Sequence, residues 1–277
     1  AMPVQHIAAF SNGEVGGNPA GVLIGESLPN NAAMQRIARE VGYSETAFAA
    51  PEADGWRVRY FSPQSEVPFC GHATIALGAA LAMRHGDGGH ALSLNDARIT
   101  VEGRRKGKLF AAALQSPPTR SAAVDPDLLT SALHLLGLAA ADLDPRLPPA
   151  RIHGGADHLL LGLADRHRLA RMDYDLEAGG ALMTAAGLVT IALVHAREPQ
   201  QFDVRNAFAS GGVLEDPATG AAAAALAGYL RDVGWPHGGS IRISQGDDMG
   251  MPSRIEVAVP ATPGSSVQVS GTARLMQ

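Results

Sequence analysis

The order of hydrophobic and polar positions predicts both helices and strands. Residues 4–10, 20–24 and 56–61 form short apolar or alternating runs of the kind that strands carry. Residues 31–41 place apolar side chains at helical spacing and are followed by Gly42, which is typical of a helix that ends in a glycine cap. The pattern therefore predicts mixed α and β structure from the start of the chain.

Two longer segments share one plan, in which an acid, a proline and a small-residue turn precede a helix rich in Ala and Leu. They are residues 66–81 (EVPFCGHATIALGAAL) and residues 215–230 (EDPATGAAAAALAGYL). Apolar residues on most faces of a helix indicate that it is buried all round. Because the two segments lie roughly half a chain apart, we expect the chain to consist of two similar halves.

The second of these segments has the residues of a tight helix entry. We expect Asp216 to be the N-cap, because its carboxylate can accept from free N–H groups of the first turn. Pro217 suits the first helical position, where its missing N–H costs nothing. A buried helix N-terminus also offers unpaired N–H groups and a positive dipole end to a carboxylate ligand. If the halves face each other, two such N-termini converge on one ligand.

The remaining elements repeat in the two halves. A hairpin and a strand over residues 92–114 end at the Ser-Pro-Pro turn of residues 116–118, which is the best boundary in the chain. We therefore expect an N-terminal lobe over residues 1–118, with the last strand as a candidate to complete it, and a C-terminal lobe over residues 119–277. The fold class is α+β, with each lobe a curled sheet that covers one Ala/Leu helix. After the boundary, helices are predicted at 127–136 and 176–186, and strands at 188–194, 202–208, 240–244, 255–259 and 267–269.

Composition excludes several classes of protein. The 277 residues are 46% hydrophobic and 18% charged, which indicates a compact globular chain. A net charge of −5 without a basic block argues against nucleic acid or an anionic membrane as the partner. No apolar run has membrane-spanning length, and no cluster has zinc-ligand spacing, so we expect no metal. A single cysteine permits no intrachain disulfide and fits a reducing cytoplasm.

Six motifs in register resemble the PhzF-like isomerase family of phenazine biosynthesis, within the diaminopimelate epimerase superfamily. They extend over essentially the whole chain. They are residues 17–22 (GNPAGV), Glu45 after the first helix, 61–63 (FSP), 70–74 (CGHAT), 215–220 (EDPATG) and 250–253 (GMPS).

The resemblance implies a specific architecture and way of working. Each of two pseudo-symmetric lobes would be a barrel-like, mostly antiparallel sheet around a central helix, with the active site in the cleft between them. Members of the family need no cofactor and are often homodimers. The implied partner is a small carboxylated substrate.

Three residues are candidates for catalysis. A base that moves a carbon-bound proton needs a carboxylate partly withdrawn from water, and Glu45 lies between a helix stop and an apolar strand. The residues alone favour a solvated turn residue at Glu45, but the resemblance reverses this, since it implies that the acid–base glutamate of the family falls at this position. His72 would lie in the first turn of a helix, where the dipole disfavours imidazolium. Asp216 could combine its capping role with that of a second carboxyl group beside Glu45.

Other residues around the two helix entries are candidates for substrate binding. Their backbone amides and small side chains would let a substrate carboxylate or ring substituent approach closely. These residues are Asn18, Cys70, Gly71, Thr219, Gly220 and Ala221.

Cys70 motivates an alternative enzyme class. In the epimerase branch of the superfamily two cysteines take and return an α-proton, and Cys70 resembles one of them, whereas Asp216 or Thr219 stands where the other would be. A racemase, epimerase or dehydratase of an amino or imino acid would use Cys70 with Asp216. A buried structural cysteine is the simpler reading. A protease-like pair with His72 is disfavoured, because residues two apart on a helix face different ways.

Two departures from the family pattern leave a non-enzymatic alternative open. Ala221 stands where the phenazine enzymes have a serine, and Met251 replaces the arginine of their Gly-Arg-Pro-Ser motif. Both bring the phenazine substrate into question while leaving Glu45, His72 and Asp216 in place. The alternative is a metabolite-binding protein on the same scaffold. The loops that would name the substrate, such as residues 121–151, carry no readable pattern.

Overall fold

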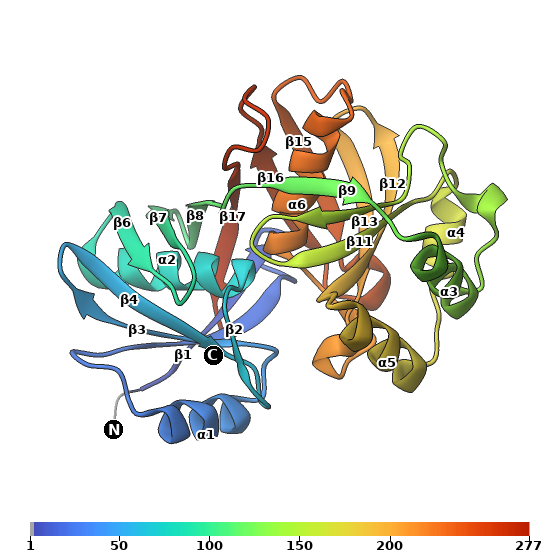
Figure 1. Cartoon of the computed structure of the whole chain (residues 1–277). Helices are drawn as coiled ribbons and strands as arrows, with labels where there is room; N and C mark the ends of the chain where they lie inside the picture. The colour runs from blue at the N-terminus through green and yellow to red at the C-terminus, as the bar shows by residue number, and fades with distance from the viewer. Residues whose placement is uncertain (1–2, 277) are drawn as a thin grey trace.

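The computed structural model describes residues 3–276, which form two lobes side by side (Figure 1). Each lobe wraps a curved sheet around one long helix, α2 in the first lobe and α6 in the second. The elements of the first lobe are β1 (Gln5–Ser11), β2 (Asn18–Ile24), α1 (Asn31–Val41), β3 (Thr46–Glu52), β4 (Gly55–Phe61), β5 (Glu66–Val67), α2 (Gly71–His85), β6 (Gly88–Ser93), β7 (Arg98–Lys106) and β8 (Leu109–Gln115).

The second lobe repeats this order around α6. Its elements are β9 (Arg120–Ala123), α3 (Pro126–Leu136), a 3₁₀ turn (Ala140–Asp142), β10 (Ala150–His153), β11 (Asp157–Gly162), α4 (Arg166–Ala170), α5 (Leu176–Ala186), β12 (Thr190–Glu198), β13 (Gln201–Ala207), a 3₁₀ turn (Ala209–Gly211), β14 (Glu215–Asp216), α6 (Gly220–Asp232), β15 (Ser240–Gln245), a 3₁₀ turn (Asp247–Met249), β16 (Ser253–Ala258) and β17 (Gln268–Leu275).

The two lobes have matching strand registers. In the first, Thr46 lies opposite Phe61, which lies opposite Glu66; in the second, Ile191, Ala207 and Glu215 take the same places. The match continues through β6 and β15 to the paired strands β7–β8 and β16–β17. The duplicated halves expected from the sequence are therefore present in the strand pairing.

The last strand joins the lobes. β17 pairs with β16 of the second lobe and also with β1 and β8 of the first, and all of these pairings are antiparallel. Figure 1 shows β17 descending between the lobes towards β1. The mostly antiparallel α+β class predicted from the sequence is confirmed, with parallel pairs at β2–β3, β4–β6, β11–β12 and β13–β15.

The central helices are buried because their small side chains let strands close around them. α2 is buried from Gly71 to Ala82 and α6 from Gly220 to Arg231. A Cβ on Gly103 of β7 would overlap the Gly78 carbonyl of α2, and a Cβ on Gly78 would come within 2.8 Å of the Val101 side chain of β7. Long side chains on these helices would push the sheet outward and open voids in the core.

The two helices begin against each other. A Cβ built on Gly71 would come within 2.7 Å of the Gly220 Cα and 2.8 Å of the Ala221 nitrogen. The two positive helix ends therefore meet at one point between the lobes, as the sequence predicted.

Local sequence signals located several elements correctly. α1 begins after an Asn30 cap and ends at Gly42, and α5 spans the predicted residues 176–186 with Asp175 as its cap. The expectation that Asp216 caps α6 is wrong. Thr219 occupies the N-cap and Asp216 lies in the short strand β14, because its backbone pairs with Asn206. The sequence pattern predicted neither strand β9 nor helix α4.

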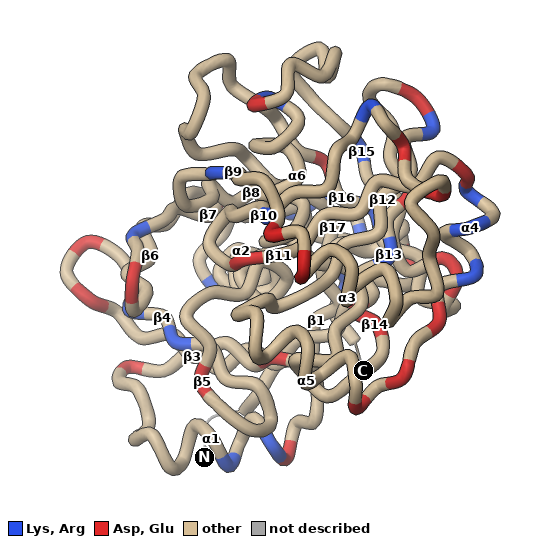
Figure 2. Tube along the Cα trace, turned by 45° about the vertical axis from the view of Figure 1, so that its right-hand side comes forward, with Lys and Arg blue, Asp and Glu red and all other residues tan. Residues whose placement is uncertain are grey.

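Charges of both signs are scattered over both lobes (Figure 2). In residues 3–276 no helix has the length and apolar character needed to cross a membrane.

Replacing Gly71 with Ala should destabilise the fold, because the new methyl group would overlap the Gly220 backbone. We expect the melting temperature to fall by about 5 °C or more, measured by differential scanning fluorimetry. Gly88→Ala is the matched control, since nothing lies within 4 Å of a Cβ there. Equal melting temperatures for the two variants would show that the helix ends are free to separate.

Candidate active site

The three chemically versatile side chains of the first lobe meet at the start of α2. Glu45 immediately precedes β3, Cys70 is the N-cap of α2, and His72 lies in its first turn. A ligand-type atom of each lies within 4.8 Å of those of the other two. All three are buried, with at most 8% of their surface exposed. The cluster is therefore shielded from bulk water, which strengthens electrostatic interactions among its members.

His72 is held in its neutral form. Burial is the main effect that lowers its pKa, while the Glu45 charge and a hydrogen bond to the Pro19 carbonyl act in the opposite direction. Its Nε2 also lies 3.4 Å from the Ser44 hydroxyl. A neutral imidazole can donate or accept a hydrogen bond, so His72 is suited to polarise a substrate carbonyl or hydroxyl.

Cys70 touches His72, contrary to the expectation that the two would face apart. Its Sγ lies 3.2 Å from Nδ1 of His72. The expectation assumed a helical Cys70, but this residue has extended backbone angles (φ −143°, ψ 116°) as the N-cap. Burial, followed by the nearby Glu45 charge, raises the pKa of the thiol well above its usual range. Cys70 is thus a protonated thiol at neutral pH, unlike the thiolate of a nucleophilic cysteine.

Asp216 enters the same region from the second lobe. Its Oδ1 accepts from Asn18 Nδ2 at 2.9 Å, across the junction between the lobes, and its Oδ2 accepts from the Thr219 hydroxyl at 2.6 Å. Burial and then the Glu45 charge raise the pKa of Asp216 to about 8, while the two donors act to lower it. Asp216 is therefore mostly protonated at neutral pH and can donate a proton or hydrogen bond.

One oxygen of the Glu45 carboxyl group is left without a partner. Its Oε2 is buried and has no hydrogen-bond partner within residues 3–276. A buried, unpaired carboxylate oxygen is costly unless something binds it, so such atoms are concentrated at functional sites. The site thus combines one unsatisfied carboxyl oxygen with one carboxyl group, Asp216, whose two oxygens both accept hydrogen bonds.

The amides of the two abutting helices complete the site. Neither α2 nor α6 has a side-chain hydrogen bond at its N-cap, and the first-turn N–H groups of a helix have no intrahelical acceptor. The amides of Gly71, His72, Gly220 and Ala221 are therefore placed where a carboxylate would be stabilised.

The structure brings together all nine residues that the sequence predicted for the site. Glu45, Cys70 and His72 form one cluster in the first lobe. Gly71, Gly220 and Ala221 lie where the two helices meet. Asn18 links the lobes through Asp216 and the Ala218 carbonyl.

Sequence reasoning missed Gln245, which lies behind Asp216. Its side chain is 2% exposed and bonds the Asp216 carbonyl and both the amide and hydroxyl of Thr219. The motif at residues 250–253 follows Gln245 closely in the sequence and was the available signal. The same turn reaches the first lobe, because the Pro252 carbonyl accepts from the Gly17 amide at 3.1 Å.

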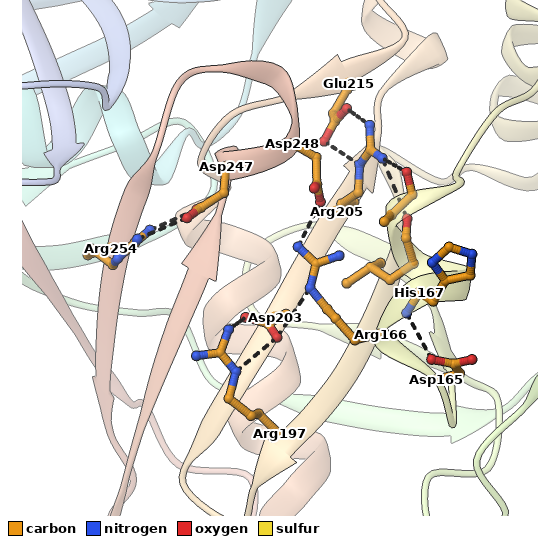
Figure 3. Close-up of polar contacts among 12 residues, drawn as sticks. Asp165, Arg166, His167, Arg197, Asp203, Arg205, Glu215, Asp247, Asp248 and Arg254 are labelled. Atoms are coloured by element: carbon orange, nitrogen blue, oxygen red, sulfur yellow. Dashed lines mark hydrogen bonds and ion pairs between the residues drawn. The ribbon is translucent and has the colours of Figure 1, made fainter.

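Ion pairs lie beside the second-lobe segments that carry Asp216 and Gln245 (Figure 3). Arg205 forms a two-pronged pair with Glu215, the residue before Asp216, at 2.6 and 3.0 Å. Arg166 bridges Asp203 of β13 at 3.3 Å and Asp248 of the turn after Gln245 at 2.9 Å. The bidentate Arg205–Glu215 pair fixes the geometry of the segment that carries Asp216. Arg166 ties the turn after Gln245 to β13 through one contact to each aspartate.

The cluster of Glu45, Cys70 and His72 is the group of side chains, in the part of the chain that the structure describes, with the spacing to hold a metal ion. Its surroundings oppose a cation, because two positive helix ends point at it. Metal ligation would also require the thiolate of Cys70, whose raised pKa favours the thiol. The geometry fits proton transfer and anion binding better.

The chain matches known proteins over nearly its whole length. Residues 7–277 match the family model described as phenazine biosynthesis-like protein. An uncharacterized isomerase of Deinococcus radiodurans is 34% identical, over 96% of this chain and 90% of that protein. A trans-2,3-dihydro-3-hydroxyanthranilate isomerase of Pseudomonas aeruginosa is 33% identical, over 96% of this chain and 94% of that protein. The solved structure of a predicted epimerase from Pseudomonas aeruginosa has a TM-score of 0.86 at 27% identity, and the match covers 100% and 98% of the two chains.

The raised pKa of Asp216 predicts how stability depends on pH. In the unfolded chain this carboxyl group returns towards its usual value of 3.8, so between about pH 4 and pH 8 the folded state binds more protons than the unfolded state. This carboxyl group therefore makes stability fall as pH rises through that window. Asp216→Asn cannot titrate, and its melting temperature should decline less between pH 5 and pH 8, by about 5 °C or more.

The comparison uses the slope of melting temperature against pH, since the substitution also disturbs hydrogen bonds at every pH. Asp54→Asn, in the exposed turn between β3 and β4, is the control and should keep the wild-type slope. A wild-type slope in Asp216→Asn would contradict the raised pKa.

Proposed function

Because this chain belongs to the phenazine biosynthesis-like protein family and its curated relatives are isomerases, we propose that it is a cofactor-independent, PhzF-like isomerase. It moves a proton on a small carboxylated metabolite that is unsaturated or cyclic, by general acid–base catalysis. The observation that supports this most is the pair of carboxyl groups, Glu45 with an unsatisfied oxygen and Asp216 held in its acid form.

The reaction needs only a proton and a pair of electrons to move. Glu45 takes a proton from a substrate carbon, and the electron pair of that C–H bond shifts along the conjugated system. A proton is returned at a second carbon, so atoms and charge balance without a redox partner. His72 and the protonated Asp216 stabilise the charge that builds up on the substrate by donating hydrogen bonds.

The helix ends hold the substrate carboxylate. Amides of Gly71, His72, Gly220 and Ala221 donate to it, and the two dipoles add electrostatic attraction. Asn18, Cys70 and Thr219 shape the walls around it. Ala221 lacks the serine hydroxyl of the phenazine enzymes, which removes one side-chain hydrogen bond and bears on which substrate is accepted. The substrate in the name of the Pseudomonas aeruginosa relative is the first compound to test.

Glu45→Gln should abolish turnover with little change in stability, because the amide keeps the shape of the carboxylate but cannot accept a proton. We expect a loss of at least about 100-fold. Proton NMR in heavy water measures both conversion of 2,3-dihydro-3-hydroxyanthranilate and deuterium entry at carbon. If neither protein acts on it, the same assay is repeated with cyclic, amino and imino acids, and retained activity of Glu45→Gln on any of them would rule out Glu45 as the base.

Cys70→Ala is the matched variant in that assay. The proposed mechanism expects the exchange to persist, whereas a racemase, epimerase or dehydratase that uses Cys70 with Asp216 would lose it and would be inactivated by thiol alkylation. A metabolite-binding protein without catalysis, motivated by Ala221 and Met251, would show a ligand-induced rise in melting temperature with no exchange.

The family likeness and the single free thiol Cys70 also support two proposals about the whole molecule, a homodimer and a cytoplasmic location. Sedimentation equilibrium should give about twice the chain mass of 28.6 kDa. A mass of one chain at micromolar concentration would contradict the dimer, and cell fractionation tests the location.

A further inference from the structure

Gln245 is oriented by partners that leave it no freedom to flip. It ends β15, and its Oε1 lies 3.3 Å from the Thr219 nitrogen, while its Nε2 lies 2.9 Å from the Asp216 carbonyl oxygen. A backbone N–H only donates and a carbonyl only accepts. The side-chain amide therefore has its oxygen towards Thr219 N and its NH₂ towards the Asp216 carbonyl.

This orientation fixes the direction of the Thr219 hydroxyl. The Gln245 Nε2 also lies 3.1 Å from Thr219 Oγ1, and an amide nitrogen has no lone pair to accept with. Thr219 Oγ1 accepts there, which leaves its own hydrogen to be donated to its other partner, the ionised Asp216 Oδ2 at 2.6 Å. The result is a one-way chain of donors from Gln245 through Thr219 to Asp216.

The other oxygen of Asp216 is held in the same sense. Asn18 Nδ2 donates to Oδ1, and it also contacts the Ala218 carbonyl, which again only accepts. Both oxygens thus receive a donated hydrogen, and donors favour the ionised carboxylate against the cost of burial.

The first lobe shows that the fold does not need this series of hydrogen bonds. By the matching registers, the positions of Asp216, Thr219 and Gln245 correspond to Val67, Cys70 and Leu94. In the first lobe an apolar residue stands at each of the positions of Asp216 and Gln245. The same strand, turn and helix form there without these side-chain hydrogen bonds. The hydrogen bonds from Gln245 through Thr219 to Asp216 in the second lobe therefore have a role other than forming the turn.

We propose that Gln245 is a positioning residue of the active site, which fixes the Thr219 hydroxyl on Asp216 and so sets how readily Asp216 releases its proton. The proposal deepens the acid–base function proposed above and rests on Asp216 acting there. Gln245 itself need not touch the substrate.

The test reads the Asp216 carboxyl group directly. Protein labelled with ¹³C at the aspartate carboxyl carbon is titrated by NMR from pH 5 to pH 10, with the Asp216 signal assigned by its absence in Asp216→Asn. The wild type should titrate at about 8. Gln245→Met, which has similar length but no donor, should titrate higher by about half to one pH unit, because the hydroxyl is free to turn away.

A second substitution separates positioning from support of the turn. Thr219→Val should raise the titration midpoint by itself, and adding Gln245→Met to it should raise the midpoint no further, since Gln245 acts through the hydroxyl. Thr219→Ser keeps the hydroxyl and should titrate like the wild type. Gln201→Met, on β13 with a contact to Ser244 at 3.3 Å, is the control for the substitution and should not change the midpoint.

The proposal is overturned if Gln245→Met titrates like the wild type, or if its full effect persists in Thr219→Val. Gln245→Leu is made in parallel, so that either folded variant decides. Deuterium exchange is then followed against pH in the same proteins. If the midpoint of Asp216 moves but the pH at which exchange falls does not, the positioning role stands, and the assignment of Asp216 as the catalytic acid fails.

Discussion

The backbone contact between Gly71 and Gly220 is the constraint on which the structure depends. No side chain lies between these two residues, so two buried helices point their positive ends at one place. The sheets must then curve around helices made of small residues, and the acidic groups of each lobe lie beside those ends. A buried Glu45 and Asp216 would be harder to accommodate without that positive field, and the substrate carboxylate of the proposed function would lack its binding site.

The matching registers show one architecture with two chemistries. Arg59 pairs with Glu66 in the first lobe as Arg205 pairs with Glu215 in the second, so the frame before each helix is retained. The reactive positions differ, because His72 corresponds to Ala221 and Cys70 to Thr219. The first lobe supplies the Glu45 carboxyl group and a neutral imidazole, and the second supplies the Asp216 carboxyl group, which accepts hydrogen bonds from Asn18 and Thr219. In the proposed reaction this asymmetry lets the first lobe take a proton while the second stabilises charge.

Features carried by neighbouring residues could be predicted from the sequence. The Gly42 stop of α1, the extent of α5, the two Ala/Leu helices and the duplicated order are local patterns, and motif resemblance selected the site residues. Interactions between distant segments could not be predicted. Asp216 has the side chain of an N-cap, yet its backbone pairs with Asn206 and the helix starts later. Gln245 is adjacent to Thr219 only after β15 has joined the sheet, and β9 is a strand because β10 is beside it.

The pairing of β17 also has a consequence for how the chain acquires its shape during synthesis. β1 and β8 are complete within the first 115 residues, but both pair with a strand that is translated much later, at residues 268–275. Until then the first lobe exposes two unpaired strand edges, and such edges can pair with strands of other chains and promote aggregation. Closing pairs so far apart in sequence is slow, since chain entropy is lost before contacts compensate. The nascent first lobe therefore keeps these two pairing edges open until residues 268–275 have been translated.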